Sequence, residues 1–96
     1  MDFRVTFSEK SLRDLQEILA YIAEDNPQAA EDFGRELVNL ATALRHFPLR
    51  YPRDPRRSGL RKTSLGAYLL YYEVLENDRV VNILHFWHGA RQPPIL

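Results

Sequence analysis

The sequence contains no cysteine, and this absence removes a whole group of possible architectures. A small domain without cysteine has neither a disulfide framework nor a thiolate metal site. Long apolar runs are also missing, since no stretch reaches the roughly 18–20 residues that a membrane span needs. The first residues, from Met1 to Arg4, lack the apolar region and cleavage site of a signal peptide. We therefore expect a cytoplasmic protein that is not attached to a membrane.

Glycine is scarce, and its few positions form no phosphate-binding motif. The four glycines are Gly34, Gly59, Gly66 and Gly89. Their scatter matches neither the GxGxxG pattern nor a P-loop. His46 and His85 stand apart in the sequence from any histidine or carboxylate at metal-ligand spacing. We therefore expect no metal site and no cofactor.

What remains is the composition of one small folded domain with an uneven charge distribution. Residues 1–96 are 45% hydrophobic and 27% charged, which is typical of a single globular domain. The formal net charge is zero. Residues 1–47, however, hold nine acids and five bases (net −4), whereas residues 48–96 hold four acids and eight bases (net +4). Such a dipolar molecule is expected to present two different faces or partner sites.

The first half of the chain shows the periodicity of a short strand followed by two amphipathic helices. Residues 3–7 alternate apolar and polar side chains, which indicates a strand with one buried face. Ser8 is a suitable N-cap for a first helix that ends shortly before Asn26. Asn26 and Pro27 suit the start of a second helix, which should stop near residues 46–47 because a proline follows. The short connection predicts an antiparallel helical hairpin.

The second half predicts a loop followed by three strands. Residues 48–58 hold three prolines and four arginines, which is typical of a loop. The predicted strands are residues 59–64, 67–76 and 79–88. Asn77 and Asp78 suit a two-residue turn of type I′ between the last two strands. This turn places Val74 opposite Val81, a favourable β-branched pair.

The last two predicted strands are apolar on both faces. One face collects Leu70, Tyr72, Val74, Val81 and Ile83. The other carries Leu69, Tyr71, Leu75, Leu84 and Phe86. Only one helical hairpin is available as cover, so we expect the second face to be a partner site. The predicted fold is α+β in the order βααβββ, a twisted antiparallel sheet with the N-terminal helical hairpin packed on one face.

This order of elements, with these residues, resembles the RelE/ParE superfamily of toxins from bacterial type II toxin–antitoxin systems. The segments that carry the likeness are residues 8–21, 26–30, 44–48, 59–61, 68–74 and 83–91. They span nearly the whole chain, and the ordered set is more specific than any one segment. The resemblance implies a small toxin that is neutralised by a cognate antitoxin protein wrapped around its surface. We expect the antitoxin to cover the exposed sheet face and the groove beside the helical hairpin.

The resemblance leaves two activities open. ParE-like members inhibit DNA gyrase, whereas RelE-like members are ribosome-dependent endoribonucleases that cleave mRNA with basic residues and a tyrosine or histidine near the C-terminus. The segment from His88 to Arg91 looks more like the ParE side, so inhibition of DNA gyrase is the favoured prediction. The alternatives are an mRNA interferase acting with the ribosome and a non-toxic binding module on the same scaffold. Whether the protein is an enzyme depends on this choice.

The catalytic candidates apply only to the RelE-like alternative. Arg61 and Arg91 have the guanidinium geometry to clamp a phosphate. His88 is the titratable group beside them near neutral pH, so it would act as acid or base. The alternative interpretation is structural, with Arg91 paired to Glu73 and His88 hydrogen-bonded at the end of a strand.

The candidate target-binding residues are basic side chains of the loop and of the segments that follow it. They are Arg50, Arg53, Arg56, Arg57, Lys62 and Arg91. A proline-stiffened segment with several positive charges is typical of a surface for an anionic partner. The alternative is a solvated loop that balances the acidic helices. Tyr51, Tyr71 and Trp87 could stack on bases, although core packing is the favoured role for Tyr71 and Trp87.

Overall fold

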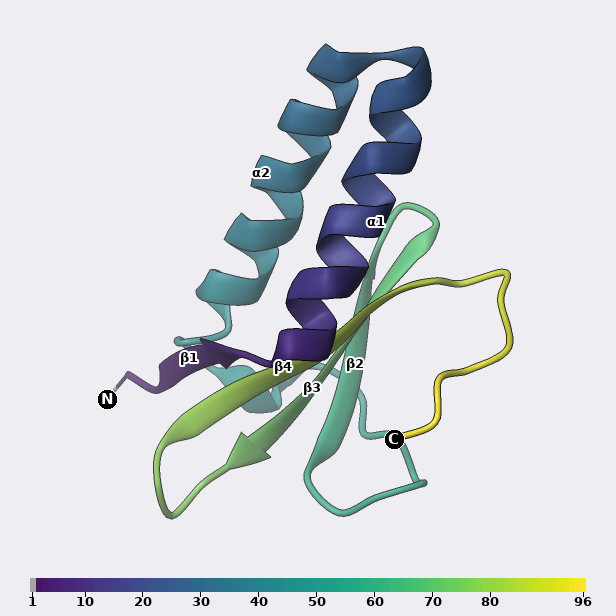
Figure 1. Ribbon diagram of the computed structural model, residues 1–96. Helices are drawn as coiled ribbons and strands as arrows, with labels where there is room; N and C mark the ends of the chain where they lie inside the picture. The colour runs from purple at the N-terminus through teal and green to yellow at the C-terminus, as the bar shows by residue number, and fades with distance from the viewer. Residues whose placement is uncertain (1) are drawn as a thin grey trace.

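The computed structural model describes residues 2–96, which form a helical hairpin on one side of a four-stranded sheet (Figure 1). The elements are β1 (Arg4–Phe7), α1 (Glu9–Asp25), α2 (Pro27–Ala43), a short 3-10 helix η1 (Pro48–Arg50), β2 (Leu60–Leu65), β3 (Tyr68–Leu75) and β4 (Val80–His88). This confirms the α+β class and the order βααβββ. Neither α1 nor α2 has the length and apolar character needed to cross a membrane.

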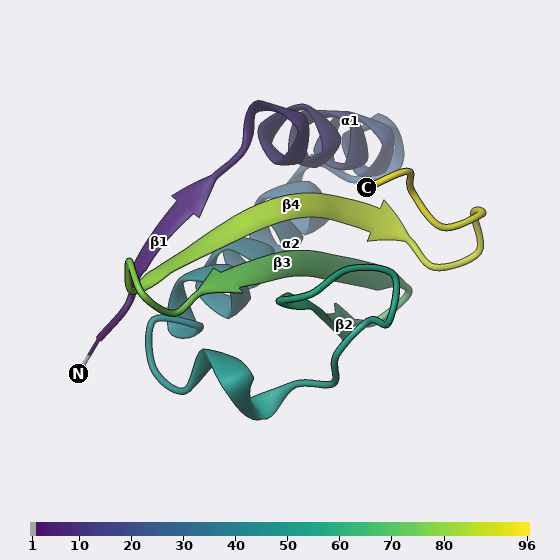
Figure 2. The same cartoon turned by 90° about the horizontal axis from the view of Figure 1, so that it is seen from below.

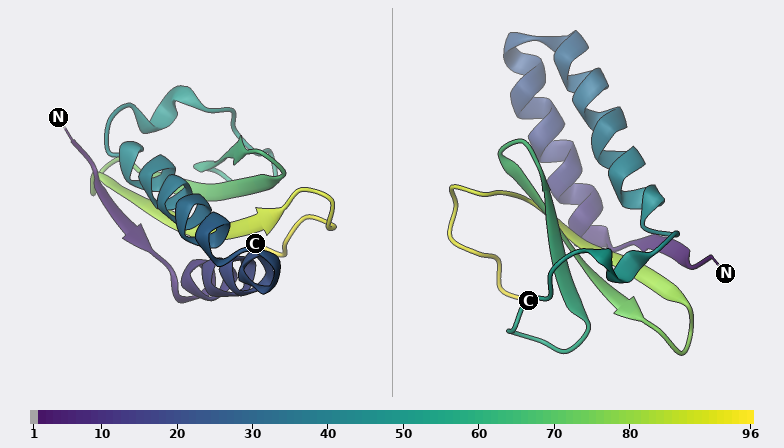
Figure 3. Two further views of the ribbon diagram at one scale, coloured as in Figure 1. Left: turned by 90° about the horizontal axis from the view of Figure 1, so that it is seen from above. Right: turned by 180° about the vertical axis from the view of Figure 1, so that it is seen from behind.

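Local capping signals begin and join the two helices as predicted. The Ser8 hydroxyl oxygen accepts a hydrogen bond from the Ser11 amide at 3.0 Å and caps α1. Asn26 ends α1 and caps α2, since its side-chain oxygen accepts from the Ala29 amide at 3.1 Å. Seen from behind in Figure 3, the ends of both helices near this connection project beyond the sheet. The amphipathic hairpin is therefore only partly covered by the rest of the chain.

The second helix ends earlier than predicted, at Ala43. The amides of Arg45 and His46 donate to carbonyls three residues back, at 3.2 and 3.1 Å. Such bonds tighten the last turn of a helix into 3-10 geometry and satisfy its free carbonyls. Phe47 then takes a left-handed conformation with φ 53°, which stops the chain from continuing as a helix.

The sheet is mixed rather than wholly antiparallel. Its strand order is β1-β4-β3-β2, which Figure 2 shows from below. β3 runs antiparallel to β2 and β4 as predicted, but β1 runs parallel to β4, from the pair Arg4–Val80 to the pair Phe7–Ile83. The two chain reversals between β2 and β4 make β4 parallel to β2, and β1 occupies the remaining edge of β4 in that same direction. An alternating pattern predicts a strand but does not predict its neighbour.

The β3–β4 hairpin has the predicted register but a different turn. Val74 lies opposite Val81, which confirms that pairing. The turn is closed by the Arg79 amide, which donates to the Glu76 carbonyl at 3.2 Å. Type I′ requires positive φ at both central residues. Among the described non-glycine residues of this turn only Arg79 has a positive φ, of 54°, so the prediction of type I′ is wrong.

A β-bulge at Leu84 exchanges the faces of the residues that follow it. Tyr72 pairs with Ile83, but Tyr71 pairs with His85, so Leu84 is an extra residue in β4. One inserted residue moves every later side chain to the opposite face of the sheet. Phe86 was expected on the second face, yet it packs in the core under the helices, and His85 takes the second face instead.

The core lies between the helices and one face of the sheet. Its buried members are Leu37, Ala41 and Leu44 of the α2 segment, and Leu70, Tyr72, Val74, Val81, Ile83 and Phe86 of the sheet. Tyr72 is fully buried, and its hydroxyl donates to the Pro48 carbonyl at 2.7 Å. Burial raises the pKa of Tyr72 to about 12. This hydrogen bond ties η1 to the centre of the core.

Candidate target-binding surface

The middle of the second face of the sheet is covered by the chain itself. Two segments lie over it: residues 50–58, here called the arginine loop, and residues 89–96, here called the C-terminal tail. The Arg56 guanidinium lies over the Tyr71 ring at 5.4 Å and donates to the Pro94 carbonyl at 2.9 Å. Trp87 Nε1 donates to the Gln92 carbonyl at 2.8 Å. Tyr71 is consequently 1% exposed, whereas Leu75 at the end of the same face is 42% exposed. The expectation of an open second face is therefore wrong for its middle, around Tyr71, and holds only near Leu75.

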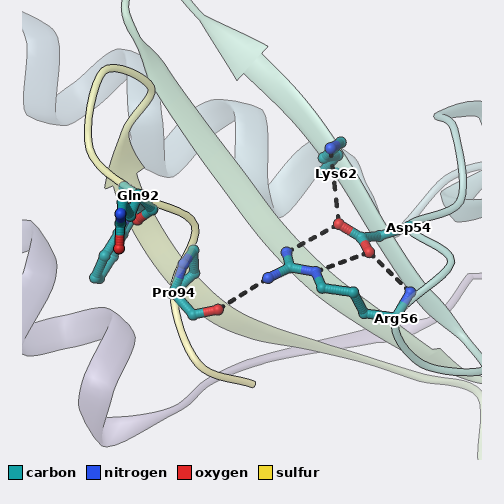
Figure 4. A network of polar contacts seen from close by, with 6 residues as sticks. Asp54, Arg56, Lys62, Gln92 and Pro94 are labelled. Carbon is teal, nitrogen blue, oxygen red and sulfur yellow. Dashed lines mark hydrogen bonds and ion pairs between the residues drawn. The ribbon is translucent and has the colours of Figure 1, made fainter.

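Asp54 organises the arginine loop from a buried position (Figure 4). It is 4% exposed, and its carboxylate accepts the Arg56 amide and Nε at 3.0 Å and Nη2 at 2.9 Å. The Lys62 ammonium lies 3.7 Å away. The hydrogen bonds from Arg56 lower the pKa of Asp54 to about 2, with smaller contributions from the charges of Arg56 and Lys62, against the opposing effect of burial. The same pairing raises the pKa of Arg56.

Three of the six predicted target-binding cations are therefore engaged inside the molecule. Arg56 and Lys62 share the Asp54 carboxylate, and Arg57 forms an ion pair with Glu73 of β3. An ion pair of this kind fixes the loop on the sheet and offsets the positive charge that the sequence suggests is available. Arg56, Arg57 and Lys62 therefore stabilise the conformation of the arginine loop.

The other three predicted cations keep their charge uncompensated. Arg50 donates to the carbonyls of His46 and Phe47 at 3.0 and 3.4 Å. Arg53 is exposed and joins β2 only through a backbone bridge. Arg91 lies over the Trp87 ring with 4.1 Å between the guanidinium carbon and the ring centroid. Within residues 2–96, none of these three arginines forms an ion pair with a carboxylate. They are the cations through which an anionic partner could be bound.

The structure separates the three catalytic candidates. Arg61 donates to the carbonyls of Leu49 and Tyr51 at 3.0 and 2.6 Å, and so holds the start of the arginine loop. It lies opposite Tyr72 in β3, whereas His88 lies opposite Tyr68. Four residues of strand correspond to about 13 Å, and β3 itself lies between the strands that carry Arg61 and His88. Arg61 is therefore held apart from His88.

His88 and Arg91 do come together. Both line a cavity of about 340 Å³ between α1 and the end of β4. His88 Nδ1 accepts the Ala90 amide at 3.0 Å, and its ring meets Tyr68 edge-on at 5.0 Å. One imidazole and one guanidinium can bind a phosphate. Without Arg61 they lack the second clamp that the predicted nuclease site requires.

A pair that the sequence did not reveal joins α1 to β4. His85 Nδ1 lies 2.8 Å from the Asp14 carboxylate, which also accepts the Phe86 amide at 3.2 Å. Asp14 thus accepts a backbone hydrogen bond at the edge of β4, past the last residue that pairs with β1. His85 is isolated in the sequence because Asp14 lies 71 positions away. The position of an acid next to the apolar stripe of α1 was the only available signal.

Charged side chains of both signs surround this pair. A cavity of about 580 Å³ between α1 and the C-terminal tail is lined by the cations Lys10, Arg13 and Arg91 and by the acids Asp14 and Glu17, among others. Among the described residues, no group of three or more histidine, aspartate or glutamate side chains is placed to hold a metal ion. Lys10, Arg13 and Arg91 are the side chains at this end of β4 that could bind an anion, and Asp14 and Glu17 oppose them within the same cavity.

The chain matches one family of known proteins. A family model described as the ParE toxin of the type II toxin–antitoxin system parDE matches residues 5–93. The fold is similar to a chromosomal ParDE toxin–antitoxin system from P. aeruginosa, with a TM-score of 0.74 and 18% identity over 90% of this chain and 95% of the other. No curated protein matches the sequence significantly.

Two RelBE complexes are also similar in structure. The toxin–antitoxin complex RelBE2 from Mycobacterium tuberculosis gives a TM-score of 0.66 and 25% identity over 92% of this chain and 99% of the other. The archaeal RelE–RelB complex from Pyrococcus horikoshii gives 0.65 and 21%, over 96% of this chain and 100% of the other. All three structures come from toxin–antitoxin systems, and they share the fold of this chain.

Proposed function

From the premise that this chain belongs to the ParE toxin family of type II toxin–antitoxin systems, we propose that it inhibits DNA gyrase and that a cognate antitoxin neutralises it. Gyrase acts on DNA inside the cell, so the proposal also assigns the protein to the cytoplasm. The observation that carries the choice of gyrase over mRNA is the position of Arg61, which is bonded to the carbonyls of Leu49 and Tyr51 away from His88. That arrangement supports a binding protein more than a nuclease.

The proposed contact surface consists of the outward cations and the aromatic side chain beside them. Arg50 and Arg53 lie on the arginine loop, and Arg91 stacks on Trp87 at the start of the C-terminal tail. Arginine and tryptophan are the residue types that dominate binding hot spots. The Asp54–Arg56 network fixes the loop before the partner arrives, so little ordering entropy is lost on binding.

A supercoiling assay with purified gyrase tests the proposal. The wild-type protein should inhibit supercoiling, and the purified antitoxin should restore it. The double variant Arg53→Glu/Arg91→Glu should raise the concentration for half-inhibition at least about tenfold, because two contacts at the partner surface turn repulsive. Arg35→Glu is the matched control, since Arg35 is equally charged but lies on α2 with a 64% exposed side chain.

An mRNA cleavage assay on programmed ribosomes, run beside the supercoiling assay, tests the alternative. The shared cavity of His88 and Arg91 is the one feature that favours an mRNA interferase. Cleaved message together with undisturbed supercoiling would overturn the gyrase proposal in favour of that activity. No effect in either assay, with correctly folded protein, would leave a non-toxic binding module.

A further inference from the structure

Phe47 is held in a strained conformation and points into solvent. It follows α2 with φ 53° and ψ 56°, in the left-handed region, and it is 81% exposed. A bulky residue at positive φ is a true outlier, because its Cβ crowds the neighbouring carbonyl. Asparagine or glycine would occupy this position at lower cost. The sequence instead places there a large apolar side chain that gains almost nothing from burial.

The surrounding residues fix this conformation from several sides. The Arg50 guanidinium donates to the carbonyls of His46 and Phe47 at 3.0 and 3.4 Å. The next residue, Pro48, is buried, and its carbonyl accepts the hydroxyl of Tyr72. Strain of this kind persists only where the structure over-determines it, and it concentrates at functional positions. The fold therefore holds the Phe47 ring outward.

The ring stands at the rim of an apolar cavity. This cavity, of about 590 Å³, is lined by Phe3, Phe47 and Leu49 among others, and Leu49 is itself 44% exposed. A second cavity of about 310 Å³ shares Phe3 and is lined by Arg4 and Arg45. The two cavities adjoin at Phe3 and form one surface around the N-terminal strand. Exposed apolar side chains gathered beside a cavity are suited to receive an apolar side chain of a partner.

The charges around the two cavities define the partner. Asp2, the acid that lines the first cavity, is already paired with His46 at 2.9 Å and Arg45 at 3.5 Å. Arg4 and Arg50 form no ion pair with any carboxylate within residues 2–96. The surface therefore offers an apolar groove with two unbalanced positive charges. Its complement is a segment with an apolar side chain between acidic residues.

We infer that this surface, formed by Phe3, Arg4, Phe47, Leu49 and Arg50 and called here the Phe47 surface, binds an acidic segment of the antitoxin. The inference rests on the assignment of the chain to a toxin–antitoxin system. An apolar side chain of the antitoxin packs between Phe47 and Leu49, and its carboxylates meet Arg4 and Arg50. The antitoxin is the protein with which such a toxin is held in complex, so it is the partner that shields an aromatic ring exposed in the free chain.

Substitution of Phe47 should change antitoxin affinity and thermal stability in opposite directions. Phe47→Asn removes the ring and tolerates the left-handed conformation, so it should raise Tm by roughly 4–8 °C. The same variant should weaken the affinity for the purified protein encoded beside the toxin gene by at least about tenfold, as expected for an aromatic anchor. Phe47→Tyr keeps both the ring and the strain, and it should leave Tm and affinity unchanged. Calorimetric titration and thermal unfolding measure the two quantities.

Charge-reversal variants test the electrostatic part of the proposed contact. Arg4→Glu should weaken antitoxin binding about tenfold and reduce its salt dependence, whereas Arg35→Glu, at an exposed position of α2, should not. Equal antitoxin affinity for Phe47→Asn and wild type would overturn the inference. It would equally be overturned if Phe47→Asn lost gyrase inhibition and kept antitoxin binding, or if it abolished a wild-type dimer seen by gel filtration. Because gyrase inhibition is measured separately, failure of the gyrase proposal leaves this test intact.

Discussion

Replacement of Asp54 by asparagine should cost stability at neutral pH and cost nothing in strong acid. In the folded protein its carboxylate receives three hydrogen bonds from Arg56 and lies near the Lys62 ammonium. These contacts lower the pKa from 3.8 to about 2. At about 1.36 kcal/mol per pKa unit, the difference amounts to about 2.4 kcal/mol. The Arg56 side chain is 37% exposed, so solvent screening reduces the expected contribution to about 1–2 kcal/mol.

The sign of the pH dependence follows from the direction of the shift. The pKa of Asp54 is lower in the folded protein than in the unfolded chain. Its charge therefore stabilises the fold fully above about pH 4, and this contribution is lost as the pH falls towards 2. Asparagine carries no charge at any pH, so Asp54→Asn should be less stable than wild type by about 1–2 kcal/mol at pH 7 and equally stable near pH 2.

Urea unfolding at a series of pH values between 7 and 2 gives the free energy of unfolding for both proteins. The matched control is Asp32→Asn, because Asp32 forms an exposed ion pair with Arg35 one helical turn away. That surface pair is worth at most about 0.5 kcal/mol. A gap between wild type and Asp54→Asn that stays constant from pH 7 to pH 2 would refute the charge argument. A loss of the same size in the control would refute the special role of the buried site.

Two further substitutions test how the elements are tied together. Tyr72→Phe should destabilise the fold by about 1–3 kcal/mol, because the Pro48 carbonyl is left without its buried donor; urea unfolding measures the loss. Asp14→Ala should cost about 2–3 kcal/mol, since both His85 and the Phe86 amide lose their acceptor. Amide hydrogen exchange at Phe86 should then speed up, and unchanged protection there would contradict the role of Asp14 at the edge of β4.

Features encoded by neighbouring residues could be predicted from the sequence. The caps at Ser8 and Asn26 act within three residues, so the helical hairpin follows from local pattern. The pairing of Val74 with Val81 follows from a short turn. By contrast, the direction and neighbour of β1 depend on a strand 76 positions later in the chain, and no local signal specifies them.

Each wrong prediction about the candidate site has a physical cause. The bulge at Leu84 leaves the apolar alternation readable in either register, so the face of Phe86 was assigned wrongly. Charges were counted as available although Asp54 and Glu73 neutralise them in the fold. The closing of the second sheet face depends on Arg56 reaching Pro94, 38 positions away. Contacts over such distances are set by the packed fold.

The pairing of β1 with β4 joins segments that leave the ribosome far apart in time. Arg4 is made 76 residues before Val80, its neighbour in the sheet. The helical hairpin needs only local contacts and can form while synthesis continues, whereas β1 must wait with the side chains of Phe3, Val5 and Phe7 uncovered. We expect closure of the sheet by β1 to be the slow step of folding, because the whole loop between the two strands must be ordered first. Until β4 has been made, β1 therefore has no partner strand in the sheet.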